Sequence, residues 1–195
     1  MVPDPTGPKL LPLSLQPLGG DVYAHVFENA RTGISRSLFW NLNVDFEPVT
    51  MEGEEWDCSF AADWLTWPVR TWRELDGMDL GRVALPAMIE PSLYLLAEHH
   101  PAALDHLQVG ARQGSSFEVA VEASAQVRIG SGQRSVPISF AARLRFAGII
   151  VANNNLQPRP ISSADAEAVA AQFIRLDGLR EPRSEGWRYV FEPET

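Results

Sequence analysis

The stretch Ser37-Leu-Phe-Trp-Asn-Leu-Asn-Val-Asp-Phe46 decides the fold. Apolar residues occupy every second position, and the positions between them are polar apart from Phe39: Leu38, Trp40, Leu42, Val44 and Phe46 alternate with Ser37, Asn41, Asn43 and Asp45. A period of two predicts a β-strand with one buried and one outward face.

The same pattern extends on both sides of this strand. A strand over residues 21–28 precedes it, and the turn-rich residues 29–33 predict a hairpin between the two. Residues 56–64 alternate in the same way, with carboxylates on the outward face, and Pro68 lies beyond their end. Thr71 and Glu74 have capping-box spacing, which predicts a short helical turn over residues 71–75.

The second half of the chain adds further strands and one helix. Residues 93–97 are too short to assign by period; a buried helix stays open, and a strand is favoured. Strands are predicted from residue 117 and over residues 136–146, joined by a hairpin at residues 130–132, and again over 187–191. Ser162 as N-cap, with Asp165 three residues later, predicts a helix that ends at Gly178.

These elements predict an α+β fold. We expect a mostly antiparallel β-sheet of about eight strands, sandwich-like, with one C-terminal helix packed on the sheet. The prolines within residues 1–19 predict an extended lead-in, and residues 20–195 contain no linker that would divide two domains. A single β-rich globular domain is therefore expected after the lead-in.

Composition excludes several classes of partner and compartment. A formal net charge of -9 disfavours nucleic-acid binding, which requires a basic surface. The longest apolar runs fall well short of the roughly 20 residues that span a membrane. Cys58 is the single cysteine, so no intrachain disulfide can form, and the N-terminus does not have the pattern of a secretory signal. We expect a cytoplasmic protein.

One segment carries acidic charge without compensation. No lysine or arginine occurs between Arg36 and Arg70, and that segment holds seven carboxylates: Asp45, Glu47, Glu52, Glu54, Glu55, Asp57 and Asp63. A field of one sign beside large aromatic residues suits docking onto a basic protein surface. Trp67 and Trp72, in a less regular region, are candidate surface anchors for such a partner, whereas the alternation places Trp56 and Trp64 in the core.

No residue pattern points clearly to catalysis. His99, His100 and His106 lie near carboxylates and suggest a metal site, but their spacing fits none of the common zinc motifs. The alternative, which we favour, is a turn between strands with solvated side chains. Cys58 falls on an apolar face, where burial would raise its pKa instead of activating it. We therefore assign no catalytic residue, metal ligand or cofactor, and an enzyme ranks third among the functions considered.

A resemblance adds to this interpretation. The stretch from Asp63 to Gly77 contains Trp-Pro-Val-Arg-Thr-Trp-Arg-Glu-Leu, and Pro91-Ser-Leu-Tyr-Leu95 and His99-His-Pro101 follow it. These segments resemble a loosely defined group of bacterial proteins encoded beside toxin genes. The resemblance covers about a third of the chain and implies a β-rich, immunity-type protein with no known active site.

Two functions from different classes follow from these observations. The first is an acidic binding protein that docks onto or neutralises a basic protein partner, such as a toxin, through the seven carboxylates, Trp67 and Trp72. The alternative is a small-molecule-binding β domain in which the aromatic residues line a cavity between sheet and helix. An apolar pocket walled by Trp56, Trp64 or Tyr94 would favour it, and a solid core would disfavour it. A structural role remains open, including a homodimer formed through an exposed strand edge.

Overall fold

A computed structural model describes residues 15–51, 53–79, 89–129, 132–153 and 155–194. Within these residues the chain forms nine strands, one 3₁₀ turn and one α-helix. Their bounds are β1 (Pro17–Asn29), β2 (Ile34–Met51), β3 (Glu54–Leu65), η1 (Trp72–Leu75), β4 (Glu90–Leu95), β5 (Glu98–Gln113), β6 (Ser116–Ile129), β7 (Gly132–Ala152), α1 (Ser163–Ala170), β8 (Arg183–Ser184) and β9 (Arg188–Phe191). The expected α+β class, mostly antiparallel with one helix, is confirmed.

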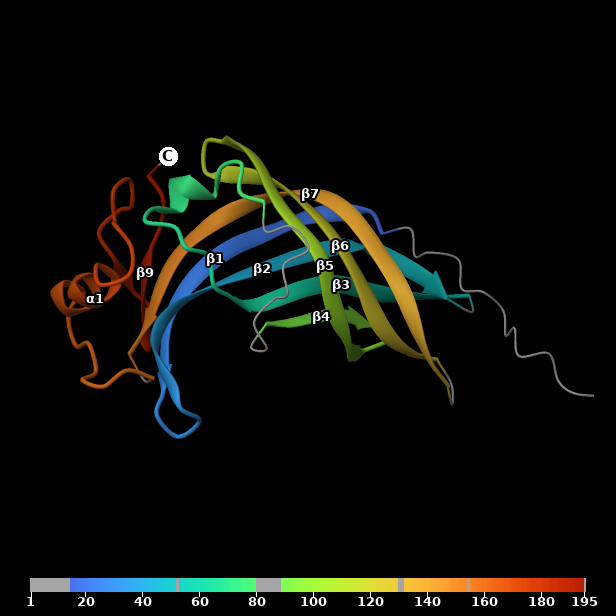
Figure 1. Cartoon of the computed structure of the whole chain (residues 1–195), viewed down its shortest axis with the longest axis horizontal. Helices are drawn as coiled ribbons and strands as arrows, with labels where there is room; N and C mark the ends of the chain where they lie inside the picture. Colours follow the sequence, from blue (N-terminus) through green and yellow to red (C-terminus); the bar gives the residue numbers. More distant parts are fainter. Residues whose placement is uncertain (1–14, 52, 80–88, 130–131, 154, 195) are drawn as a thin grey trace, which may run out of the picture.

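The sheet closes on itself. Neighbouring strands from β1 to β7 pair antiparallel in sequence order, and β1 also pairs with β7, in parallel. The two layers expected of a sandwich are thus opposite walls of one strongly curved sheet (Figure 1). Inward-facing side chains fill the space between the walls, with Leu42, Phe60 and Leu93 fully buried. The alternation read from the sequence identifies this inward face correctly.

A short extension of the sheet continues from the end of β7. Beyond residue 148, β7 pairs with β9 on the side opposite β1, and β8 pairs with β9 as the outermost strand. Gly148 makes this possible, because it adopts φ 122° and a Cβ there would lie 2.3 Å from the carbonyl oxygen of Phe191. Helix α1 packs beside the same end of β7 (Figure 1).

The segment after β3 covers one end of the closed sheet. Trp72 stacks on Phe146 with ring centroids 4.9 Å apart, and Trp67 contacts Trp40 at 5.5 Å. Trp67 and Trp72 are only 6% and 1% exposed. The expectation that they lie at the surface was wrong, because this irregular segment crosses the open end of the core and its indole rings fill that end.

Several predicted elements need correction. His99 and His100 do not lie in a turn. The turn is formed by Leu96 and Ala97, and both histidines belong to β5, a strand of 16 residues that includes Pro101. Ser162 caps α1 as predicted, accepting the backbone N–H of Asp165 at 3.1 Å, but the helix ends at Ala170 and not near Gly178. The expected strand over residues 93–97 is β4, and the helical turn near Thr71 is η1, which has no side-chain cap from Thr71.

The predicted lead-in lies mostly outside the described residues. Where the description starts, Leu15 is buried and β1 already begins at Pro17. The hairpin at residues 130–132 falls largely outside the description as well, although β6 and β7 pair up to Ile129 and Gly132 on its two sides. Within the described ranges, no helix has the length and apolar character that crossing a membrane requires.

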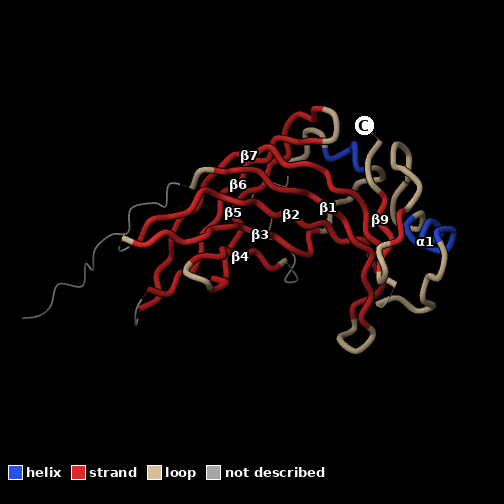
Figure 2. The backbone as a smooth tube through the Cα atoms, turned by 180° about the vertical axis from the view of Figure 1, so that it is seen from behind, coloured by secondary structure: helices blue, strands red, loops and turns tan. Residues whose placement is uncertain are grey.

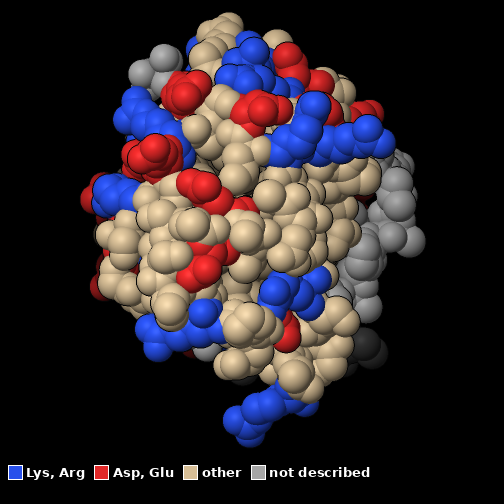
Figure 3. All heavy atoms as spheres, turned by 90° about the vertical axis from the view of Figure 1, so that its left-hand side faces the viewer, with Lys and Arg blue, Asp and Glu red and all other residues tan. Residues whose placement is uncertain are grey.

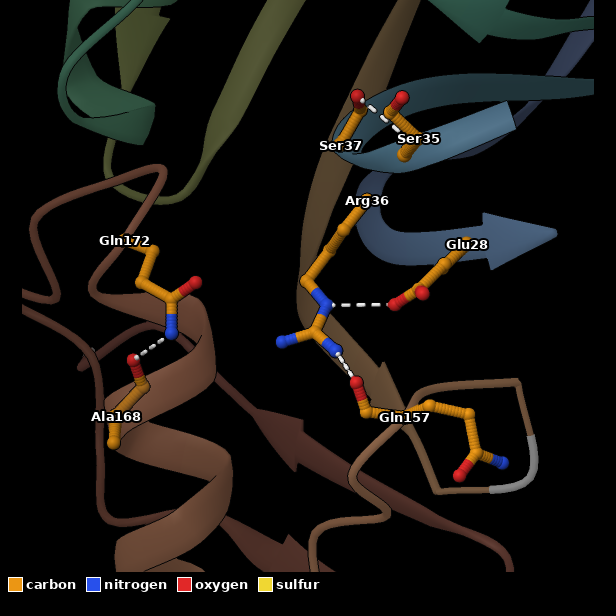
Figure 4. Close-up of polar contacts among 7 residues, drawn as sticks. All are labelled: Glu28, Ser35, Arg36, Ser37, Gln157, Ala168 and Gln172. Carbon is orange, nitrogen blue, oxygen red and sulfur yellow. Dashed lines mark hydrogen bonds and ion pairs between the residues drawn. The ribbon is translucent and has the colours of Figure 1, made fainter. Parts of the chain in front are cut away.

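A polar contact joins the β1–β2 hairpin to the chain beyond β7. The guanidinium of Arg36 donates to Glu28 at 2.9 Å and to the carbonyl oxygen of Gln157 (Figure 4). In the same view, the side-chain amide of Gln172 donates to the carbonyl oxygen of Ala168 near the end of α1. Arg36 thus holds the residues around 155–157 next to the outer face of β1.

Candidate functional site: a groove on the outer face of the sheet

A groove runs over the outward face of β1, β2 and β3, which lie side by side in Figure 2. It consists of two adjoining hollows of about 590 and 710 Å³ that share Tyr23 and Asn43 in their walls. We call the two together the outer groove. Its first hollow lies between β1 and the extension formed by β8 and β9, and its second crosses β3 to β4 and β5. The outer groove is separate from the filled interior.

A β-bulge places two important side chains on the outward face. Trp40 pairs with Leu65 and Leu42 pairs with Ala62, so β3 has one residue more than β2 between these pairs. Trp64 takes φ 65°, a left-handed conformation that is rare for a bulky residue. As a result Asp63 and Trp64, although adjacent, both line the outer groove, whereas strict alternation would turn Trp64 inward.

Trp64 is the centre of an aromatic cluster on this face. Its ring centroid lies 4.9 Å from Phe27, 5.1 Å from Phe39 and 5.3 Å from His25, each in an edge-to-face arrangement. Tyr23 extends the row, 6.4 Å from His25. Phe39, the residue that breaks the alternation of its strand, is buried under this cluster. The cluster gives the first hollow a rigid, largely apolar wall.

His25 is held in its neutral form within this wall. Burial lowers the pKa of His25 to about 4, because its charged form would lose hydration. The amide Nδ2 of Asn41 donates to Nδ1 of His25 at 2.8 Å, so the ring proton belongs on Nε2. The amide oxygen of Asn41 accepts the backbone N–H of Trp64 at 3.4 Å. One buried side chain thus orients both the imidazole and the bulge.

The second hollow contains a pair of carboxylates. Asp63 and Glu90 are direct partners in the β3–β4 register and both line the wall. Burial, followed by the charge of Glu90, raises the pKa of Asp63, while His99 acts in the opposite direction. Burial and the charge of Asp63 also raise the pKa of Tyr23. Burial and the charge of Glu90 therefore make the ionised form of Asp63 less favourable than that of a solvent-exposed aspartate.

The wall formed by β8 and β9 is charged but internally compensated. Arg183 pairs with Glu185 at 2.6 Å and with Glu192 at 3.0 Å, and Arg188 pairs with Glu185 at 2.7 Å. The guanidinium of Arg188 also lies 5.2 Å from the ring centroid of Trp187, which is 53% exposed. Figure 3 faces the end of the molecule that carries α1 and β9, and shows acidic and basic side chains interleaved there.

The structure brings together most of the predicted acidic residues, but not all. Five of them are exposed on the part of the β2–β3 hairpin nearest its turn, which we call the acidic hairpin: Asp45, Glu47, Glu54, Glu55 and Asp57. None of the five takes part in an ion pair within the described part of the chain. Glu52 lies outside the described residues, and Asp63 lies apart from the hairpin end, in the outer groove.

The histidines and the cysteine of the sequence analysis do not gather at one site. His100 is buried, with Nε2 3.0 Å from the carbonyl oxygen of Leu95, whereas His106 pairs with Asp79 at 3.1 Å. No group of three or more potential metal-ligating side chains was found within the described ranges. Burial raises the pKa of Cys58 to about 11, which agrees with the expected inert thiol.

Sequence reasoning did not identify the main residues of the outer groove. Tyr23 and His25 line the first hollow and lie on the strand predicted over residues 21–28, where they were assigned no role. Asn41, which bonds to His25, was expected only on the polar face of its strand. The available signal was the aromatic residue in each outward position, at Tyr23, His25 and Phe27, since a solvated strand face is usually polar. The contribution of β8 and β9 depends on long-range pairing and had no local signal.

No protein-family model, curated protein or solved structure matches this chain.

Proposed function

We propose that the protein binds a small organic ligand in the outer groove. The observation that carries this proposal is the placement of Trp64, whose ring stands in the groove wall because its backbone adopts a left-handed conformation. Such backbone conformations cost free energy and are concentrated at functional sites. The hydrogen bond from Trp64 to the buried amide of Asn41 holds this conformation in place.

The composition of the wall also supports ligand binding. An aromatic cluster, a few fixed polar groups and a hollow of about 590 Å³ are typical of sites for small organic molecules. The neutral imidazole of His25 offers a hydrogen-bond donor at Nε2 without a charge to hydrate. Buried apolar side chains such as Leu42 and Phe60 fill the space between the walls of the sheet, and the two hollows lie on the outer face, which is the proposed site.

The neutral apolar dye Nile red tests this proposal, with binding followed by its fluorescence. Ala147→Phe places a large ring in the first hollow, which Ala147 lines, and we expect it to weaken dye binding at least about tenfold. Ala141→Phe is the matched control, because Ala141 is exposed on the same strand and does not line the outer groove. Equal binding by both variants and the unaltered protein would argue against the groove as the site.

A second function is favoured by a separate observation. The five carboxylates of the acidic hairpin are exposed and lie outside every ion pair formed among the described residues. We propose that this surface docks onto a basic protein partner, as an immunity-type protein docks onto a toxin. An uncompensated field accelerates such an encounter and weakens as salt rises. With Trp67 and Trp72 buried, the contact would depend on charge and not on tryptophan anchors.

A pull-down from native lysate at low and then high salt tests the docking proposal. We expect a basic protein that elutes as salt rises and is lost when Glu54, Glu55 and Asp57 are changed together to lysine. The matched control reverses Asp105, Glu122 and Glu167, which are exposed on other elements and, like the hairpin carboxylates, take part in none of the ion pairs recorded among the described residues. Retention of the partner by the hairpin variant would contradict the proposal. A homodimer through a strand edge stays a third proposal, for which β8 is the outermost strand.

A further inference from the structure

The two hollows of the outer groove differ in chemical character. The first has the aromatic wall centred on Trp64, and Ile150 and Val190 also line it. The second contains the carboxylates of Asp63 and Glu90. Residues that face each other directly across an antiparallel pair have Cβ atoms about 5 Å apart, so these two negative charges lie close together. A molecule lying along the groove would contact an apolar surface at one end and two carboxylates at the other.

The negative charge of the second hollow is not compensated by arginine. The groove has two arginines in its wall, Arg183 and Arg188, and both already pair with glutamates of β8 and β9. Neither Asp63 nor Glu90 takes part in any of the ion pairs that the structure records among described residues. Among the groups that act on Asp63, the imidazole of His99 is the one that opposes the rise in its pKa.

We propose that the outer groove binds an organic cation, with its ammonium group between Asp63 and Glu90 and its apolar body against Trp64. This inference rests on the ligand-binding function proposed above and specifies the class of ligand. Two facing carboxylates and the hydroxyl of Tyr23 supply acceptors for the N–H donors of an ammonium group. The faces of Tyr23 and Trp64 attract positive charge further through their ring quadrupoles.

The state of Asp63 in the free protein favours the same class of ligand. The pKa of Asp63 is raised by burial and by Glu90, so its negative charge costs free energy when the groove holds no cation. A bound ammonium group would remove part of that cost. An anionic ligand would add a third negative charge to the same hollow, and a neutral ligand would leave the repulsion unchanged.

Three probes of equal length and different charge test the proposal: 4-phenylbutylammonium, 4-phenylbutanol and 4-phenylbutyrate. Isothermal titration calorimetry at neutral pH measures the affinity of each for the full chain. We expect the ammonium probe to bind about tenfold more tightly than the alcohol, and the carboxylate probe to bind most weakly. Asp63→Asn should weaken the ammonium probe about tenfold and so reduce its preference over the alcohol. Glu90→Gln is the second variant and should also weaken binding of the ammonium probe. Glu54→Gln, on the acidic hairpin, is the control and should leave that binding unchanged.

The outcomes separate the ligand class from the proposed function. If the alcohol binds as tightly as the ammonium probe, or if Asp63→Asn and Glu90→Gln leave the preference unchanged, the organic-cation assignment is wrong while ligand binding in the groove stands. If none of the three probes binds and Nile red also fails to bind, the proposed function itself is wrong.

Discussion

Asn41 donates a hydrogen bond from its amide Nδ2 to Nδ1 of His25 across 2.8 Å, between two strands of the closed sheet. The same amide accepts the backbone N–H of Trp64 through its oxygen. Asn41 is 1% exposed, so both groups are shielded from water. This single side chain therefore joins the neutral histidine, the bulge and the aromatic wall of the outer groove.

Removing this amide should be costly. We expect Asn41→Ala to lower the free energy of unfolding by about 2 kcal/mol, because the Trp64 N–H and Nδ1 of His25 both lose a partner. Asn43→Ala is the matched control, two residues along the same strand and only half-buried, and should cost less. Urea denaturation measures both. Equal losses in the two variants would show that Asn41 has no special role.

His25 predicts a loss of stability on mild acidification. The pKa of His25 is about 4 in the folded protein and about 6.5 in an unfolded chain, so between these values the unfolded state binds the additional proton. The contribution of the neutral ring is intact above pH 6.5 and decreases as the pH falls toward 4, by roughly 3 kcal/mol in total. His25→Gln should remove this part of the pH dependence, as measured by urea denaturation at a series of pH values. An unchanged slope between pH 6.5 and 4.5 would contradict the prediction.

Asp63 should have the opposite effect from His25 on the pH dependence of folding stability. Its pKa is higher in the folded protein than in the unfolded chain, so the folded state binds its proton first as the pH falls. The ionised carboxyl of Asp63 destabilises the folded protein fully at pH values above its pKa in the folded state. This destabilisation decreases as the pH falls and is absent below its pKa in the unfolded chain. Asp63→Asn should therefore stabilise the protein at neutral pH, with a gain that vanishes in acid. A loss of stability at pH 7 would indicate that the carboxylate makes a favourable contact in the free protein.

Gly148 predicts a sensitive junction between β7 and β9. A Cβ at this position would lie 2.3 Å from the carbonyl oxygen of Phe191, and φ 122° disfavours any side chain. Gly148→Ala should cost more than 1 kcal/mol, since the extension would have to move away from β7. Gly114→Ala has a positive φ but open space around the Cβ position, and serves as the control. Similar losses of unfolding free energy in both variants would show that the positive φ alone causes the loss at Gly148, and not the close approach of Phe191.

The sequence predicted the inward face of the sheet well. The alternation around Trp40 and Leu42 corresponds to β2, and the cap at Ser162 corresponds to the start of α1. These features depend on local periodicity and on short-range hydrogen bonds, which a sequence records directly. The closure of the sheet through β1 and β7 depends on pairing between residues more than 120 positions apart, such as Asp21 and Arg145, and left no local pattern.

The candidate site was harder to predict because its residues break the local rules. Trp64 points outward only because β3 has an additional residue opposite β2, and Trp72 is buried only because an irregular segment covers the end of the sheet. Alternation assigned Trp64 to the core, and the irregular sequence around Trp72 suggested a surface position, so both tryptophans were predicted in the wrong environment. The run of acidic residues was recognised from the sequence, but that five of them lie on one surface depends on the pairing of β2 with β3, which the sequence does not specify.

The indole N–H resonances of the tryptophans test the central claim, that the outer groove is the binding site, most directly. Titration of ¹⁵N-labelled protein with 4-phenylbutylammonium should shift the signals of Trp64 and Trp187, which line the groove. The signals of Trp40, Trp67 and Trp72, buried elsewhere, should stay in place. Single tryptophan-to-phenylalanine variants assign each signal. Shifts confined to the buried tryptophans would contradict the account. Saturation of the protein with the probe without any change in the indole N–H signal of Trp64 would contradict it as well.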